Sequence, residues 1–416
     1  MPIKFLHVAD THIGVENYGR LDSGTGLHTR LQDFIKSLRF AFEEALKENV
    51  DLVIFAGDAY RSCDPTPTHQ REFASLIRMV SAEKIPVVMV TGNHDNPVAF
   101  GKASSVDIFG TLGTEGVYIR SKDDLICIQT QSGPIQVACL PWLNRSHLVA
   151  RGPYQNLDQE EIVEKLQNLG AEIIDALAAR VDPKIPAVLT AHVTASEATF
   201  SGSEQTAIIG RDPVFLTSTL ANAAFDYVAL GHIHKFQDVN AGGSPPVVYP
   251  GSIERLDFGE EKDDKGVCIV TIHDPEGDAS RNVEYRFVRT PARPFKTFDI
   301  QIQEDQDPTT AILEEIGRHT LTDAIVRVIY DLQSDRTDKV DLRAVKSALE
   351  NAFLVASIAP KPKTHTHQRR ANITEDMGLK EALHAYTQNH PELEDQENDL
   401  QTYAARLEGE LIEKQK

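Results

Sequence analysis

Five short segments of the chain carry side chains that commonly bind metal ions, and each segment follows an apolar, β-branched run. The segments are Asp10-Thr11-His12, Gly57-Asp58, Gly92-Asn93-His94-Asp95, His192 and Gly231-His232-Ile233-His234. Ligand sites of open α/β folds lie at the carboxyl ends of strands. We therefore expect these segments to meet at one rim and to form a site for two divalent metal ions.

The types and spacing of these residues suit such a site. Two ions about 3.5–4 Å apart need a shared carboxylate, and Asp58 can give one oxygen to each ion. Asp10 and His12 are two residues apart and should share a face where their strand ends. His232 and His234 have the same spacing. Imidazole, carboxylate and amide ligands together suit Mn, Fe or Zn better than Ca or Mg.

No single motif decides the interpretation. An isolated Asn-His-Asp or His-x-His sequence is more often not a metal site. His7 lies inside the first apolar run, and we interpret it as a buried structural histidine. It is the combination of five segments, each after a strand-like run and in this order, that favours a metal centre.

The five segments resemble the signature of the calcineurin-like metallophosphoesterases. The residues around them resemble one branch, the SbcD-type nucleases of DNA double-strand-break repair and their archaeal and eukaryotic relatives. The resemblance covers residues 1–290. The segments that carry it are VADTHIG (8–14), GDAY with the following PTP (57–67), LPW (140–142), DYVALGHIHKFQ (226–237) and YPGSIERLDFGEE (249–261).

The resemblance implies a role for each residue of the five segments. Two metal-binding shells share one carboxylate: Asp10, His12, Asp58 and His234 for one ion, and Asp58, Asn93, His192 and His232 for the other. His94 matches the catalytic histidine, which acts as a general acid or positions the scissile phosphate. Asp95 matches the carboxylate that orients this histidine. The expected cofactors are two Mn²⁺ ions.

One position departs from the pattern of these relatives. Many of them have Asp or His where this chain has Arg61, three residues after Asp58. An arginine stays protonated, so it cannot serve as a metal ligand or a base. Its guanidinium could instead bind a phosphate through two parallel hydrogen bonds, or it could face solvent. The sequence leaves both interpretations open.

Length and composition fit a multidomain α/β protein. The chain has 416 residues, 41% of them hydrophobic, which predicts two or three domains with a substantial core. We expect no transmembrane helix, because no run of 18 apolar residues occurs. The four cysteines form no C-x-x-C pair, and the chain starts without a basic, cleavable leader, so a cytoplasmic location is expected.

The net charge of −20 argues against strong DNA binding by the chain alone. The charge is unevenly distributed, since residues 391–416 contain eight Asp/Glu and three Lys/Arg, whereas residues 361–370 read KPKTHTHQRR. Bound metal ions would also add local positive charge. We therefore expect that local patches, a partner, or both attract the phosphates.

Residues 1–290 alternate strand-like runs with amphipathic helices, the clearest at 31–49, 69–84 and 160–181. The strand–turn–strand patterns at 117–142 and 247–289 indicate antiparallel edges. Together with the resemblance, they predict a four-layered αββα sandwich. Residues 291–361 predict a small α/β domain, which in the resembled family caps the active site and binds DNA. Residues 362–416 predict a basic linker and two helices.

The two C-terminal helices each carry an apolar stripe. The stripes are Leu379, Leu383 and Tyr386 on the first helix, and Leu400, Tyr403, Leu407 and Leu411 on the second. An amphipathic helix needs an apolar partner. That partner is either the chain's own domain or, as the resemblance implies, the coiled-coil base of an SbcC-like ATPase, and we favour the ATPase.

These observations favour a Mn-dependent DNA nuclease, a 3′-to-5′ exonuclease with endonuclease activity. A small-molecule phosphodiesterase or nucleotidase with the same metal site is the first alternative. A weakly catalytic scaffold for a DNA-repair ATPase is the second. The resemblance also implies a homodimer that forms through helices near the rim of the active site.

Overall fold

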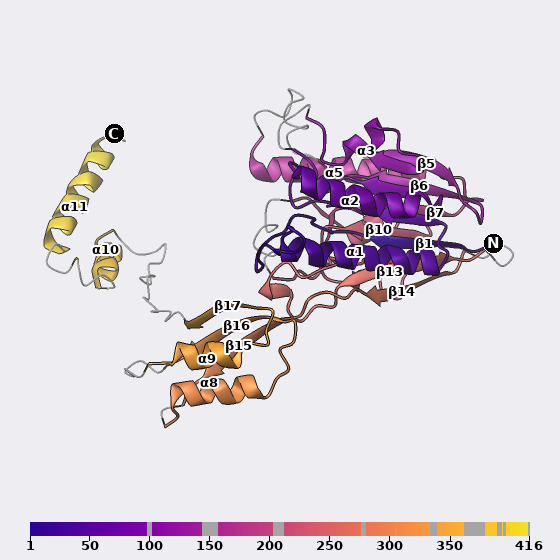
Figure 1. Cartoon of the computed structure of the whole chain (residues 1–416). Coiled ribbons are helices and arrows are strands. Elements are labelled where there is room, and N and C mark those ends of the chain that lie inside the picture. Colours follow the sequence, from indigo (N-terminus) through magenta and orange to yellow (C-terminus); the bar gives the residue numbers. More distant parts are fainter. Residues whose placement is uncertain are drawn as a thin grey trace. The chain divides into compact units, whose positions relative to one another are not determined.

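The computed structural model describes residues 1–97, 102–143, 157–202, 212–275, 280–303, 305–332, 339–361, 379–388, 393 and 397–414 (Figure 1). Its contacts divide the chain into two compact units, Met1–Ala359 and Pro360–Lys416. Each unit is described by itself.

Two six-stranded sheets form the centre of the first unit. The first sheet has the order β14 (Val283–Arg289), β13 (Gly266–Ile272), β1 (Ile3–Val8), β2 (Leu52–Phe55), β3 (Val87–Val90) and β4 (Val117–Arg120). The second has the order β11 (Gln237–Asp238), β12 (Val247–Tyr249), β10 (Tyr227–Gly231), β7 (Ala187–His192), β6 (Pro134–Leu140) and β5 (Asp124–Gln129). The central strands are parallel, and β13, β14, β5 and β11 supply the antiparallel edges.

The two sheets pack face to face because their strands are apolar on both faces. In β1, Phe5 faces the core between the sheets, whereas Leu6 and Val8 face the outer core beneath the helices. Such continuous apolar runs are typical of parallel strands that are buried on both sides. Each large side chain buried in this way contributes about 1.5–3 kcal/mol to stability.

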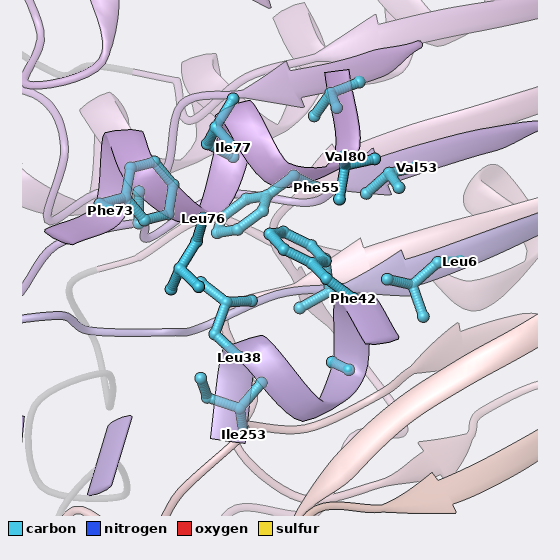
Figure 2. Packing of buried hydrophobic residues seen from close by; sticks show 14 of the residues in the cluster. Leu6, Leu38, Phe42, Val53, Phe55, Phe73, Leu76, Ile77, Val80 and Ile253 are labelled. Atoms are coloured by element: carbon cyan, nitrogen blue, oxygen red, sulfur yellow. The ribbon is translucent and has the colours of Figure 1, made fainter. Parts of the chain in front are cut away.

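Helices cover the outer face of each sheet. α1 (Thr29–Lys47) and α2 (Pro67–Ser81) lie on the first sheet, where Phe42 and Leu76 meet Phe55 of β2 (Figure 2). α5 (Gln159–Ala178) packs on the second sheet. The predicted αββα sandwich is therefore confirmed. Each of these helices begins one or two residues before its predicted start, because the capping side chains His28, Thr66 and Asp158 precede the apolar stripes.

A third sheet follows in the chain, with the order β15 (Phe295–Gln301), β16 (Ile325–Asp331) and β17 (Leu354–Pro360). α8 (Pro308–Gly317) and α9 (Leu342–Ala348) pack on it around a separate core that contains Phe298, Ile312 and Val326. This is the predicted order of strand, helix, strand, helix and strand. Its treatment as a capping domain over residues 291–361 stays a prediction.

Short elements complete the described part of the first unit. They are α3 (Asp107–Thr111), β8 (Thr194–Ala195), β9 (Val214–Phe215), α7 (Thr217–Leu220) and the 3₁₀ helix η1 (Phe258–Glu260). η1 lies next to the candidate site.

The second unit contains α10 (Leu379–Gln388) and α11 (Glu397–Lys414), which contact each other. Tyr386 and Tyr403 of the predicted stripes are 44% and 64% exposed. The basic segment 361–370 lies, apart from Lys361, outside the described residues. Among the residues that the structure describes, no helix is both long and apolar enough to span a membrane.

Candidate metal centre

The seven predicted metal ligands come from the carboxyl ends of strands in both large sheets. Asp10 and His12 follow β1, Asp58 follows β2, and Asn93 follows β3. In the second sheet, His192 is the last residue of β7, and His232 and His234 follow β10. The site therefore depends on the packing of one sheet against the other.

The backbone bends sharply at this point. Asp10, His12, Asp58 and His232 have φ values of 52°, 41°, 57° and 102°, which L-residues rarely adopt. A Cβ atom on Gly92 would overlap the carboxylate of Asp58, so only glycine fits there. Strained backbone of this kind costs stability and is concentrated at functional sites.

His12, His234 and Asp10 form the first group of donor atoms. The Nε2 atoms of His12 and His234 lie 3.0 Å apart, and their ligand atoms and a carboxylate oxygen of Asp10 all lie within 4.8 Å of one another. Two imidazole nitrogens that face each other can share one cation through their lone pairs. All three residues are buried.

Asn93, His192 and His232 form the second group. Asn93 Oδ1 lies 2.9 Å from His192 Nε2 and 3.1 Å from His232 Nδ1. Asp58 lies between the two groups, with Oδ2 3.3 Å from His192 Nε2 and 3.9 Å from His12 Nε2. This is the position that a shared carboxylate requires.

The electrostatics of the buried carboxylates fit a site for cations. Burial raises the pKa of Asp10 to about 7, against the opposing charges of His192 and His234. Burial would also raise the pKa of Asp58, but His192, His94 and His12 hold that pKa well below its usual range. Burial lowers the pKa of His12 well below its usual value, so its ring is neutral and can donate a lone pair. A divalent cation would stabilise both carboxylates in their ionised form.

His94 lies beside these groups, but its ring is held differently from the prediction. Its ring centroid is 4.9 Å from that of His12, and its Nδ1 lies 2.7 Å from the carbonyl oxygen of Arg61, to which it donates. Asp95 was predicted to orient this ring, but the hydrogen bonds described for its carboxylate go to other groups. Asp95 instead accepts hydrogen bonds from the backbone amides of Asp58 and Gly92, at 2.9 Å and 3.0 Å. Asp95 therefore fixes the loops that carry the ligands.

Arg61 contributes its backbone to the site. Its carbonyl accepts from His94, and its amide donates to the carbonyl of Ile13 at 3.1 Å. The residue itself is exposed beside the donor cluster. This exposure is compatible with both interpretations of the side chain.

Three residues next to the predicted ligands were not identified from the sequence. Glu260 accepts a hydrogen bond from His234 Nδ1 at 2.9 Å, an Asp212 oxygen lies 3.6 Å from His232 Nε2, and the ring of Trp142 lies 5.1 Å from that of His232. Glu260 and Trp142 lie in the segments YPGSIERLDFGEE and LPW, which carry the family resemblance. That membership was the only signal, because nothing in their spacing relates them to the histidines.

A comparison with known protein families also supports a metal centre at this position. Residues 3–236, more than half of the chain, match the family described as calcineurin-like phosphoesterase. The chain belongs to this family. Family membership together with the buried cluster of aspartates and histidines indicates that the site binds divalent metal ions.

The individual proteins that match the chain have low sequence identity to it. The SbcD protein of the SbcCD nuclease from Staphylococcus epidermidis is 26% identical over 272 residues, which cover 65% of this chain and 66% of that protein. The SbcD protein of Escherichia coli is 27% identical over 290 residues, covering 68% of each chain. The DNA double-strand break repair protein Mre11 of Archaeoglobus fulgidus is 25% identical over 374 residues, covering 86% of this chain and 73% of that one.

These matches confirm the predicted resemblance to SbcD-type nucleases of the calcineurin-like phosphoesterase family. The match spans only about two thirds of the length of the bacterial relatives.

Proposed function

We propose that the chain is the nuclease component of a DNA double-strand-break repair complex and hydrolyses phosphodiester bonds in DNA with two Mn²⁺ ions. We propose a 3′-to-5′ exonuclease that also has endonuclease activity. The observation that carries this proposal is the position of Asp58 between two groups of donor atoms, one around His12 and His234 and one around Asn93 and His192. The resemblance to SbcD and Mre11 supports DNA as the substrate.

Each residue of the site would have its own role. The two ions, when bound, supply Lewis acidity and charge stabilisation at the scissile phosphate. Asp10, His12, Asp58 and His234 would hold one ion, and Asp58, Asn93, His192 and His232 the other. His94 donates its Nδ1 proton to the carbonyl of Arg61, so Nε2 is the atom that can deliver a proton to the leaving oxygen or position the phosphate. Asp95 keeps the amides of Asp58 and Gly92 in place.

A comparison of substrates tests the proposal. Metal-free protein is supplied with Mn²⁺ and assayed on single-stranded and duplex DNA, on nucleoside monophosphates and on cyclic nucleotides, while bound metal is counted. We expect two ions per chain and cleavage of DNA. Hydrolysis confined to the nucleotides would identify a small-molecule phosphodiesterase or nucleotidase, and no hydrolysis with both ions bound would indicate a scaffold.

Arg61 provides a more specific prediction. If its guanidinium binds a phosphate, Arg61→Ala should raise KM for DNA about 2–5-fold, a modest effect because the residue is exposed. The carbonyl that accepts from His94 is backbone and is retained, so kcat and metal content should not change. Arg61→Lys should restore KM only in part, because lysine lacks the forked geometry. Unchanged kinetics in both variants would assign the side chain to solvent.

We further propose that α10 and α11 bind an SbcC-like coiled-coil ATPase and that the chain forms a homodimer. The ring of Tyr403, which lies on the predicted stripe of α11 and is 64% exposed, supports the ATPase partner, because an exposed aromatic ring on an amphipathic helix is suited to a groove between helices. The net charge of −20 agrees with a partner that supplies part of the attraction for DNA.

Deleting residues 372–416 should therefore leave metal binding and cleavage of simple DNA ends unchanged, while co-purification with the ATPase and stimulation by ATP are lost. Tyr403→Glu should weaken co-purification without unfolding, because the ring is 64% exposed. Thr402→Glu is the matched control, because Thr402 is the adjacent exposed residue and does not belong to the apolar stripe. A truncated chain that still co-purified fully with the ATPase would assign the helices to packing within the chain.

A further inference from the structure

A buried ion pair lies next to the candidate metal centre and has no part in the mechanism above. Glu260 ends η1, and Lys265 immediately precedes β13. Their side chains are 1% and 0% exposed, and Lys265 Nζ lies 2.8 Å from Glu260 Oε2. Buried ion pairs rarely improve stability over a well-packed apolar pair of the same volume. A role other than stabilisation is therefore needed to explain why this pair is buried.

Both members of the pair hold the same histidine. Glu260 Oε1 accepts from Nδ1 of His234 at 2.9 Å, and Lys265 Nζ donates to the backbone carbonyl of His234 at 2.9 Å. The third donor of the ammonium goes to Ser252 Oγ at 2.9 Å. All three Nζ donors are thus satisfied, and His234 is held by its ring and by its backbone.

The hydrogen bond to Glu260 determines which nitrogen of His234 carries the ring proton. Because Nδ1 donates to the carboxylate, Nε2 carries no proton in the neutral ring and presents its lone pair. That lone pair lies on the side of His12, whose Nε2 is 3.0 Å away. A carboxylate on the outer nitrogen also makes the inner nitrogen a stronger ligand.

The segment that carries Glu260 is itself anchored. The amide of Leu256 donates to Glu260 Oε2 at 2.9 Å. Phe258 of η1 lies against the ring of Phe295 of β15 at 4.9 Å between centroids, and the guanidinium of Arg327 of β16 lies 4.4 Å from the centre of the Phe258 ring. The amide of Leu256 therefore holds the carboxylate directly, and the contacts of Phe258 hold the turn of η1 that carries it.

We propose that Glu260, supported by Lys265, is a positioning residue that fixes the ring of His234 for metal binding. The proposal rests on the assignment of His234 as a ligand in the proposed function. The groups described in contact with the Glu260 carboxylate, His234 Nδ1, Lys265 Nζ and the amide of Leu256, are all donors, so the carboxylate acts as the acceptor for each of them.

Glu260→Gln should disturb this arrangement in a specific way. Two donors, the amide of Leu256 and Lys265 Nζ, point at Oε2, so the amide oxygen of glutamine must take that place. Its NH₂ group then faces His234 Nδ1, which must become the acceptor. The ring proton moves to Nε2, and the nitrogen that faces His12 can no longer bind a cation.

Glu254 offers a matched control. It is a fully buried glutamate of the same segment, paired with Arg30 at 3.8 Å and accepting from the amide of Arg255 at 2.9 Å. It contacts none of the predicted ligands among its described hydrogen bonds and ion pairs. Glu254→Gln therefore removes a buried charge and leaves the hydrogen bonds of His234 unchanged.

The experiment is a Mn²⁺ titration of the metal-free full chain, with free Mn²⁺ followed by its electron paramagnetic resonance signal and Tm recorded in parallel. We expect Glu260→Gln to weaken one of the two Mn²⁺ sites about 10–100-fold and Glu254→Gln to lower Tm with both affinities unchanged. Glu260→Gln also leaves the buried charge of Lys265 without its partner and should lower Tm. In Glu260→Gln/Lys265→Met, which removes both buried charges, Tm should rise again while the weak site remains weak.

Wild-type affinity for both ions in folded Glu260→Gln, or an equal loss in Glu254→Gln, would overturn the proposal. So would recovery of metal affinity together with Tm in the double variant, because the role of Glu260 would then be structural. If the wild-type chain bound no Mn²⁺, the proposed metal centre itself would fail, and this result is distinguishable from the others.

Discussion

Replacing His94 with alanine is expected to leave both metal ions bound and to reduce DNA cleavage at least about 100-fold, the scale on which removal of an acid–base group acts. The ring of His94 belongs to neither of the two proposed metal-binding shells. Its contribution to the ligands is made by its backbone amide, which donates to Asp58 Oδ1 at 2.9 Å and remains in the alanine variant. Metal content and single-turnover cleavage of a labelled duplex are the measurements.

His319→Ala is a suitable control for this variant, because His319 is an exposed histidine that pairs with Glu315 in the region of the third sheet. It should cleave DNA at the wild-type rate. Loss of a metal ion from the His94 variant would mean that the ring is a ligand, since it also lies in one cluster with His12 and Asp58. Cleavage at the wild-type rate would remove His94 from the mechanism.

The main features of the fold could be predicted from the sequence because they depend on local patterns. The apolar runs before Asp10, Asp58 and His192 are strands with both faces buried, and this pattern is continuous along the sequence. The grouping of the donor residues could also be predicted from the sequence, since carboxyl ends of parallel strands meet at one edge of a sheet. The donor residues here come from the edges of two sheets, and no local pattern specifies how these sheets pack together.

Asp10 and His12 both lie in the donor cluster, but the alternation of a strand does not bring them together there. Asp10 and His12 were expected to share a strand face, but both have positive φ angles and lie in the turn after β1. The alternation of a strand does not apply to such a backbone. What places His12 Nε2 near His234 Nε2 is the turn together with the packing of the two sheets.

The hydrogen-bond partners of the histidines in the candidate site could not be predicted. Asp95 is adjacent to His94 and seemed suited to hold it, yet its carboxylate turns into the loop and accepts from the amides of Asp58 and Ala59. Glu260 lies 26 residues from His234 and reaches it only because η1 folds back beside the site. Contacts of this kind arise from tertiary packing, so residue types and spacing do not reveal them.

Replacing Asp58 with alanine should have the most severe effect of all, because it removes the carboxylate that both groups of donor atoms share. Its Oδ2 lies 3.3 Å from His192 Nε2 and 3.9 Å from His12 Nε2. Without it, each group keeps its imidazoles but loses negative charge, and both affinities should fall. We expect fewer than two Mn²⁺ per chain and loss of DNA cleavage well beyond about 100-fold.

Asp51 is a matched control because it flanks the other end of the same strand. It is a buried aspartate directly before β2, and it accepts from the amides of Lys4 and Ser132, each at 3.0 Å. Asp51→Ala leaves those amides unsatisfied, so it should lower Tm while the metal content stays at two. If Asp58→Ala still bound two ions with wild-type affinity, Asp58 would not be the shared ligand. If Asp51→Ala lost the ions equally, the loss would report general destabilisation rather than a missing ligand.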